Sequence, residues 1–344
     1  MKIFTGYQKG VNLGGWLSQY GEYDELHFDS FILEKDIKTI AEWGMDHVRV
    51  PIDFILLENE DGQRNETGYR HLHDVKNWCN KYHLNMVIDL HETYGYSFDP
   101  LKKEMDRIKF FHAPDLQDRF FHLWDEISKE FKEESGLAFE LLNEVVCSEV
   151  YEQWNAISEK AVQVIRKNAP DTPIIIGGVR YNDVNAVELL PKPEDSHIVF
   201  NFHCYEPFAF THQKAYWVDG MTDDFAMSYP DTIRHYQNAS RKFSKELGSN
   251  IDRIQDQMIS SEYFKTIFKP AIEHALKCNV PLYCGEYGVI DRADCVGTLN
   301  WFRDIHNAFK ENGIGHCIWN YKEKDFGISG EHYKDVLPEI LKSI

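Results

Sequence analysis

Eight short apolar runs, separated by longer amphipathic segments, constrain the fold of this 344-residue chain more than any other feature. Each run has the length of a strand and stays apolar at successive positions, which is typical of parallel strands buried on both faces. The runs that predict strands cover residues 10–15, 47–52, 85–91, 137–143, 173–178, 197–205, 281–286 and 315–320. None of them is long enough to predict a transmembrane helix.

The segments between these runs have helical periodicity. A helix predicted over residues 28–43 has Asp29 and Ser30 as capping residues near its start and Gly44 at its end. The other predicted helices cover residues 67–82, 114–132, 150–168, 184–190, 262–277, 296–311 and 335–342. Eight strands alternating with eight helices predict an α/β fold, the (β/α)8 or TIM barrel. A doubly wound sheet is the alternative, but eight regular units favour closure.

One connection is longer than the others. About fifty residues (208–261) separate the sixth strand from the next strong helix, and aromatic residues lie at the start of this segment. Long structured insertions in compact domains usually serve a function or cover a site. We therefore expect a single catalytic-type domain over residues 1–344, with a small helical subdomain inserted over residues 208–261.

Composition limits the partners and the compartment. The chain has 37 Lys and Arg against 56 Asp and Glu, a formal net charge of −19, which argues against nucleic acid as a ligand. Seven cysteines are spread singly along the chain, which predicts reduced thiols rather than a disulfide framework. The first ten residues lack the apolar core of a signal peptide. These features suggest a cytoplasmic monomer without membrane contact, or a secreted protein whose leader was removed.

Two glutamates lie at strand ends that face each other in such a barrel. Functional side chains of (β/α)8 barrels lie at the carboxyl ends of the strands. Glu144 follows the fourth run and Glu286 ends the seventh. Two carboxyl groups about 5 Å apart are what retaining glycoside hydrolysis requires. Other polar or aromatic residues that the strand ends supply are Arg49, His91, Asn143, His203, Tyr205 and Trp319.

Seven motifs, each on a predicted strand, resemble glycoside hydrolase family 5 in that family's order. They are VNLGGW (11–16), HVRVP (47–51), DLH (89–91), LLNE (141–144), FHCY (202–205), GEYG (285–288) and IWNY (318–321). Any one of these motifs is weak evidence for the family, but seven of them in the family's order are specific evidence. The length and the insertion resemble most the bacterial endoglucanase C type. The resemblance implies hydrolysis of β-1,4-glucan or mixed-linkage β-glucan, or of their oligosaccharides, with retention of configuration and with no cofactor or metal.

The resemblance also implies roles for the strand-end residues. Glu144 is expected to be protonated in the free enzyme and to donate its proton to the glycosidic oxygen, with the nearby charge of Glu286 raising its pKa. Glu286 is expected to be ionised, held by Arg49 and by a hydrogen bond from Tyr205, and to attack the anomeric carbon.

The remaining strand-end residues are expected to contact the sugar. Asn143 is placed to bind the sugar 2-hydroxyl, His91 and His203 complete a polar floor, and Trp319 offers a ring to the reacting sugar. In the insertion, Trp217 is expected either to reach a bound sugar or to pack within the core of the subdomain.

For the remaining candidate sugar contacts, an ordinary structural role is the alternative. His212, Trp16, Tyr20 and Tyr321 are either sugar contacts or packing residues. Taken singly, an arginine on a strand is most often part of a structural ion pair, and a histidine or tryptophan there most often belongs to the core. Family members often have two adjacent histidines after the third strand, whereas this chain has Glu92 in the second position, which puts the sugar contacts there in doubt. His91 and Glu92 lack a third metal ligand at suitable spacing.

Other functions remain open on sequence alone. The same mechanism could act on β-1,3-glucan, mannan or xylan, and the opening VNLGGWL also resembles fungal exo-β-1,3-glucanases. A non-catalytic carbohydrate-binding barrel is disfavoured because both glutamates are present. A phosphate-using barrel enzyme is disfavoured because the Gly-rich loop expected near the last two strands is missing.

Overall fold

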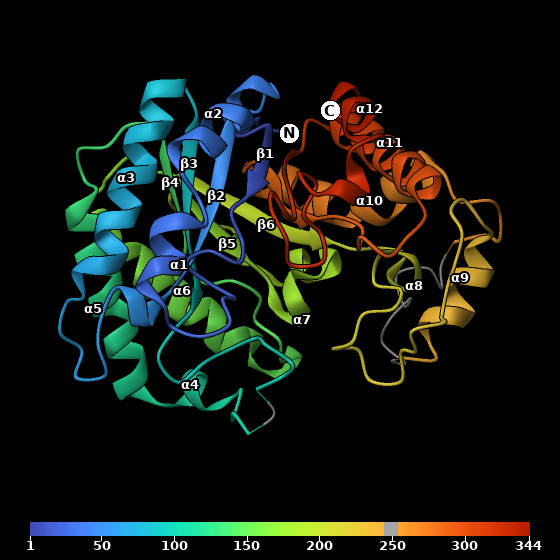
Figure 1. Ribbon diagram of the computed structural model, residues 1–344. Helices are drawn as coiled ribbons and strands as arrows, with labels where there is room; N and C mark the ends of the chain where they lie inside the picture. The colour runs from blue at the N-terminus through green and yellow to red at the C-terminus, as the bar shows by residue number, and fades with distance from the viewer. Residues whose placement is uncertain (103, 244–253) are drawn as a thin grey trace.

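A computed structural model describes residues 1–102, 104–243 and 254–344 of the chain. Eight parallel strands close into a barrel in chain order, and the last strand pairs with the first (Figure 1). The strands are β1 Lys9–Asn12, β2 His47–Asp53, β3 Asn85–Glu92, β4 Leu137–Glu140, β5 Ile174–Gly177, β6 Ile198–Cys204, β7 Leu282–Tyr287 and β8 Gly315–Ile318. The predicted (β/α)8 barrel is confirmed.

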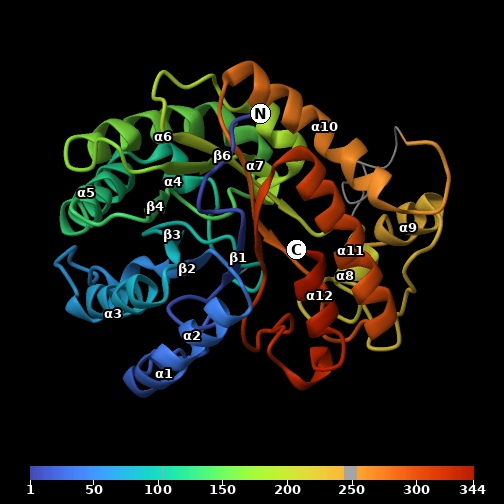
Figure 2. The ribbon, with the colours of Figure 1, turned by 90° about the horizontal axis from the view of Figure 1, so that it is seen from above.

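Helices surround this barrel on its outer side (Figure 2). The α-helices are α1 Glu25–Ser30, α2 Glu34–Glu42, α3 Glu66–Tyr82, α4 Lys109–His112, α5 Pro114–Glu130, α6 Tyr151–Arg166, α7 Val179–Asn182, α8 Phe208–Thr211, α9 Ile233–Ser240, α10 Ser261–Cys278, α11 Cys295–Asn312 and α12 Leu337–Ser343. Short 3-10 helices are η1 Phe54–Leu56, η2 Ser148–Val150, η3 Val184–Leu189 and η5 Glu331–Tyr333. Within the described ranges, no helix combines the length and the apolar character needed to span a bilayer.

Two predicted helices differ from the observed ones. The helix predicted over residues 28–43 is two helices, α1 and α2, because Leu33 is extended (φ −127°, ψ 167°) and a new helix begins after it. The N–H of Leu33 donates to Asp36 Oδ2 at 2.8 Å and so caps the second helix. The helix predicted over residues 184–190 is the 3-10 helix η3.

Side chains inside the barrel form two layers. Alternate residues of a strand point to the same face of a sheet. An apolar layer, which Phe4 and Tyr7 complete, fills the barrel toward the amino ends of the strands; its strand residues are Val87, Ala138, Ile175, Val199, Tyr283 and Cys317. Two residues further along three of these strands lie Asp89, Glu140 and Asn201, all fully buried. The barrel is therefore closed at one end by packing and polar toward the other.

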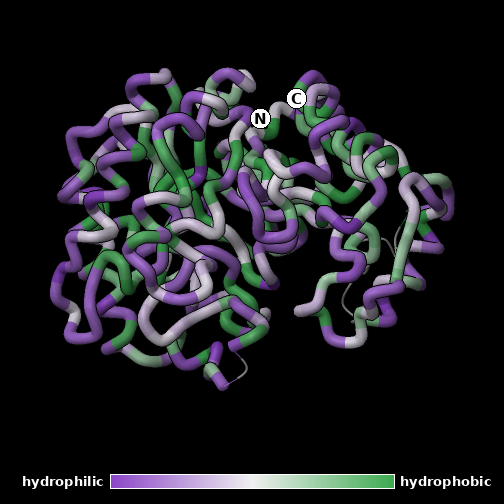
Figure 3. Tube along the Cα trace, in the orientation of Figure 1, coloured by the Kyte–Doolittle hydropathy of each residue, from purple (hydrophilic) through white to green (hydrophobic). Residues whose placement is uncertain are grey.

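The inserted segment lies at one side of the barrel, where Figure 1 shows α8 and α9. Its described residues include a bridge between Thr232 and Met258. Residues 244–253 of the segment lie outside the described residues, so the inserted helical subdomain stays a prediction. In Figure 3 hydrophobic residues are frequent in the interior, and the outer helices alternate between hydrophilic and hydrophobic residues, as expected for amphipathic helices that cover a buried sheet.

Candidate active site

A cavity of about 1230 Å³ opens at the carboxyl ends of the strands. It is larger than the roughly 300–1,000 Å³ of a pocket for one small ligand, and so has room for more than one sugar ring. The predicted residues that line it are Glu144, Glu286, His91, His203, Tyr205, Trp319 and Trp217. Arg49 and Asn143 are buried; Arg49 binds Glu286, and Asn143 accepts a hydrogen bond from Arg49.

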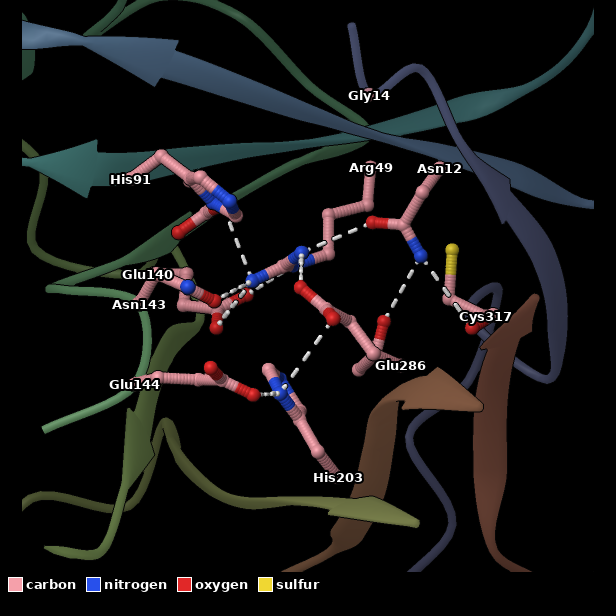
Figure 4. Close-up of polar contacts among 12 residues, drawn as sticks. Asn12, Gly14, Arg49, His91, Glu140, Asn143, Glu144, His203, Glu286 and Cys317 are labelled. Carbon is pink, nitrogen blue, oxygen red and sulfur yellow. Dashed lines mark hydrogen bonds and ion pairs between the residues drawn. The ribbon is translucent and has the colours of Figure 1, made fainter. Parts of the chain in front are cut away.

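Arg49, on β2, is the cation of the site (Figure 4). Its Nη1 lies 2.8 Å from Glu286 Oε1, and its Nε and Nη2 bind both oxygens of Glu140 at 2.7 and 2.9 Å. Nη2 also lies 3.0 Å from Asp89 Oδ2 and donates to Asn143 Oδ1 at 2.9 Å. Burial alone would lower the pKa of Arg49, but Asp89, Glu140 and Glu286 together raise it well above its ordinary value. One fixed positive charge therefore serves three buried carboxyl groups.

Glu144 and Glu286 lie close together, with His203 between them. One oxygen of each glutamate and a ring nitrogen of His203 all lie within 4.8 Å of one another. His203 Nδ1 lies 2.8 Å from Glu144 Oε1 and 3.7 Å from Glu286 Oε2. The hydroxyl of Tyr205 donates to Glu286 Oε2 at 2.8 Å. Both oxygens of Glu286 are thus held by donors, one from β2 and one from the end of β6.

The two glutamates have different electrostatic environments. Burial, and next the charge of Glu286, raise the pKa of Glu144 well above its ordinary value. Burial also raises the pKa of Glu286, but Arg49 and the Tyr205 hydrogen bond oppose it. A proton that the pair takes up therefore goes to Glu144. The sequence suggested Glu286 as the cause of the shift, whereas burial is the larger cause.

His91 and Trp319 form one wall of the cavity. Their rings are parallel, with centroids 5.8 Å apart. His91 Nδ1 lies 2.5 Å from Asp89 Oδ2, and burial, with Arg49 nearby, lowers the pKa of His91 to about 4. At neutral pH the imidazole is uncharged. A Cβ at Gly14 would lie 2.5 Å from the indole of Trp319, so the ring position depends on a glycine there.

Sequence reasoning missed several residues that hold the site in place. Glu140 and Asp89 pair with Arg49, and Asn201 Nδ2 donates to Glu140 Oε1 at 2.9 Å. The sequence did contain a signal, because each acid lies inside an apolar run: Asp89 in MVIDLH and Glu140 in LAFELL. A buried charge is costly unless it is paired, so each acid pointed to an internal cation.

The weaker candidates divide into two groups. Tyr20 and His212 line the cavity. Trp16 is fully buried and its Nε1 donates to the carbonyl oxygen of Phe28 at 2.8 Å, while the hydroxyl of Tyr321 donates to Asp36. Trp16 and Tyr321 are therefore packing residues, not sugar contacts.

The site also contains the residue types of a metal centre. Among the described residues, Glu144, His203 and Glu286 are the one group of three that could approach a cation. Their nearest atoms already contact one another or Tyr205, and Arg49 supplies the positive charge beside Glu286. Glu92, next to His91, instead binds Ser97 and, at 2.5 Å, Lys102.

Comparisons with known proteins agree over most of the chain. Residues 7–325 match the family described as cellulase, glycosyl hydrolase family 5. Endoglucanase C of Acetivibrio thermocellus is 38% identical over 344 residues, covering 98% of this chain and 97% of that protein. Cellodextrinase A of Ruminococcus flavefaciens is 41% identical over 310 residues, covering 90% and 84%. The crystal structure of endoglucanase Cel5A from the hyperthermophilic Thermotoga maritima has the same fold, with a TM-score of 0.75 at 24% identity over 98% and 97% of the two chains.

The closed barrel and the carboxyl pair in its cavity define a barrel glycoside hydrolase. The chain belongs to glycosyl hydrolase family 5, the cellulase family. The resemblance of its strand-end motifs to that family is confirmed.

Proposed function

We propose that the protein is a retaining endo-β-glucanase that hydrolyses β-1,4-glucan or mixed-linkage β-glucan. The observation that carries the proposal is that carboxyl oxygens of Glu144 and Glu286 lie within 4.8 Å of each other. Retaining enzymes hold their carboxyl groups about 5–5.5 Å apart, whereas inverting enzymes need about 6.5–9.5 Å to admit water. The names of the relatives, endoglucanase C and cellodextrinase A, support a β-glucan substrate.

The reaction has two steps in this proposal. A Glu286 oxygen forms a bond to the anomeric carbon while the bond from that carbon to the glycosidic oxygen breaks, and the departing oxygen takes the proton of Glu144. Glu144 then removes a proton from water, which displaces Glu286 and restores both side chains. The raised pKa of Glu144 favours the first role, and the donors from Arg49 and Tyr205 favour an ionised Glu286.

Asn143 and Trp319 are proposed to hold the reacting sugar. Asn143 Nδ2 is buried and has no hydrogen-bond partner within the described part of the chain, while its Oδ1 is fixed by Arg49. The free amide N–H suits a sugar 2-hydroxyl, a contact that strengthens in the transition state. The indole of Trp319 supplies an apolar face for the ring of the same sugar.

Stereochemistry and labelling test this mechanism. We expect the first product to be the β-anomer, because two inversions at one carbon give retention of configuration. NMR can detect this anomer before mutarotation sets in. A 2-fluorosugar inactivator should label the peptide that contains Glu286. A first product with the α-configuration, or a label on another carboxylate, contradicts the assignment.

A panel of polysaccharides tests the substrate. Reducing-sugar release from carboxymethylcellulose and barley β-glucan should far exceed release from laminarin, mannan and xylan. If laminarin, mannan or xylan is cleaved preferentially, the proposed substrate is wrong but the proposed mechanism stands. If none of the polysaccharides is hydrolysed, the result favours a carbohydrate-binding protein.

Trp217 is proposed to bind a sugar from the inserted segment, residues 208–261. It lines the cavity and packs near Phe326 and His212, with ring centroids 6.4 and 6.3 Å away. Trp217→Ala should raise KM for cellotetraose about 5- to 30-fold, because a lost aromatic contact of about 1–2 kcal/mol corresponds to that factor. Trp78→Ala, on α3 outside the cavity, is the control, and equal KM values in both variants would refute the contact.

A further inference from the structure

The segment labelled α7, which follows β5, has the backbone of a left-handed turn rather than of a regular α-helix. Arg180, Tyr181 and Asn182 have φ values of 57°, 58° and 54°, in the left-handed region that costs ordinary residues roughly 1–2 kcal/mol each. Asparagine tolerates this region, whereas arginine and tyrosine rarely adopt it. The N–H of Tyr181 donates to the carbonyl oxygen of Val145 at 3.1 Å. The turn is therefore fixed to the residue that follows Glu144, and its conformation needs an explanation.

The turn buries the side chain of Asn182 beyond the end of β5. Asn182 is only 1% exposed, and a Cβ at position 177 would lie 2.2 Å from its Oδ1, so Gly177 makes room for it. The amide Nδ2 of Asn182 lies 3.3 Å from Nε2 of His203. The opposite ring nitrogen, Nδ1, lies 2.8 Å from Glu144 Oε1. Asn182, His203 and Glu144 thus form a continuous chain of polar contacts.

The single proton of a neutral imidazole can lie on either ring nitrogen. His203 is neutral because burial, and next the charge of Arg49, lower its pKa well below the ordinary value. The NH2 group of Asn182 faces Nε2, and because an NH2 group can only donate, this orientation requires Nε2 to accept and assigns the ring proton to Nδ1. The hydrogen bond at Nε2 therefore determines whether Nδ1 acts as a donor or as an acceptor toward Glu144.

We propose that Asn182 is a positioning residue that fixes the Nδ1–H tautomer of His203 and thereby reserves the proton of Glu144 for the substrate. With this tautomer, His203 donates to Oε1, and the Glu144 proton stays on the other oxygen for transfer to the glycosidic oxygen. With the opposite tautomer, Nδ1 would accept that proton, and the leaving group would depart as an alkoxide. The inference rests on the proposed role of Glu144 as general acid.

Asn182→Asp tests the inference because it replaces a donor by an acceptor of nearly the same shape. A carboxylate beside Nε2 draws the ring proton to that nitrogen and leaves Nδ1 without one. On aryl β-cellobiosides with poor leaving groups, kcat/KM should fall about 10²–10⁴-fold, the contribution of general acid catalysis. On a dinitrophenyl cellobioside, whose leaving group needs no proton, the fall should be much smaller. A purely structural role would lower both rates equally.

Two further measurements make the test independent of how well that variant folds. In protein with 15N-labelled histidine, the His203 signal, assigned by its loss in His203→Ala, should report protonated Nδ1 in the wild type and protonated Nε2 in Asn182→Asp. Asn182→Ala removes the donor without adding an acceptor, and should show the same leaving-group dependence with a smaller loss. Asn155→Asp on α6 makes the same chemical change where the amide contacts Leu189 on the outer surface, and should leave both rates unchanged.

The outcomes separate this inference from the proposed function. Equal losses on all aryl glycosides, or a wild-type His203 protonated on Nε2, would overturn the role of Asn182 while leaving Glu144 as the acid. A Glu144→Gln variant without leaving-group dependence would instead overturn the proposed function itself.

Discussion

Replacing Glu144 by glutamine is expected to lower kcat/KM on barley β-glucan by about 10²–10⁴-fold. Glutamine keeps the shape of the side chain but has no proton to give to the departing oxygen. A dinitrophenyl cellobioside should be affected less in its first step, because its leaving group is stable as an anion. Initial rates on both substrates measure the difference.

The control for this experiment is Glu149→Gln, an exposed glutamate five positions along the chain on η2. It should retain the activity of the wild type on both substrates. Wild-type activity of Glu144→Gln on β-glucan would remove Glu144 from the mechanism.

Replacing Arg49 by methionine is expected to lower the free energy of unfolding by about 3–5 kcal/mol, because it leaves buried carboxylates without their cation. Asp89, Glu140 and Glu286 each lie within 3.0 Å of the guanidinium. The same change should abolish hydrolysis, since a Glu286 without this partner holds its proton more strongly and attacks less readily. Urea unfolding and initial rates measure the two effects.

This loss of stability should also depend on pH. Without Arg49 the pKa values of these carboxyl groups in the folded state rise above their unfolded values, and the pKa of Asp89 is already raised to about 7 by burial. A carboxyl group whose pKa is higher in the folded state destabilises the fold when it is ionised. The loss in the free energy of unfolding of Arg49→Met should therefore become smaller as the pH falls through that folded-state pKa. Arg303→Met removes an exposed ion pair with Glu339, and should cost about 1 kcal/mol or less. Equal losses in the two variants would contradict the role of Arg49.

The barrel could be predicted because its strands are buried on both faces and therefore stand out as apolar runs. The break between α1 and α2 could not, because the apolar period of residues 28–43 continues through the extended residue Leu33. The ends of strands such as β4 were predicted too far along, because Leu141 and Leu142 are as apolar as the strand that they follow.

The candidate site could be predicted where a fold rule linked strand ends to function, as for Glu144 and Glu286. Asp89 lies inside β3, and Glu140 lies in the middle of the run predicted as a strand over residues 137–143, so that rule passed over both. Asn182 was missed for another reason. Its position depends on three residues with left-handed backbone and on the space above Gly177. Neither feature can be predicted from a pattern of residue types.

The pairing of β1 with β8 has a consequence for how this enzyme is made. The sheet cannot close until Gly315–Ile318 has been synthesised, because the final strand fills the gap between β7 and β1. Until then two strand edges are open, and such edges pair readily with other chains. Contacts between residues so distant in sequence also form slowly. Catalytic competence is therefore acquired only once the last strand is made, and the strand edges stay open to other chains until that point.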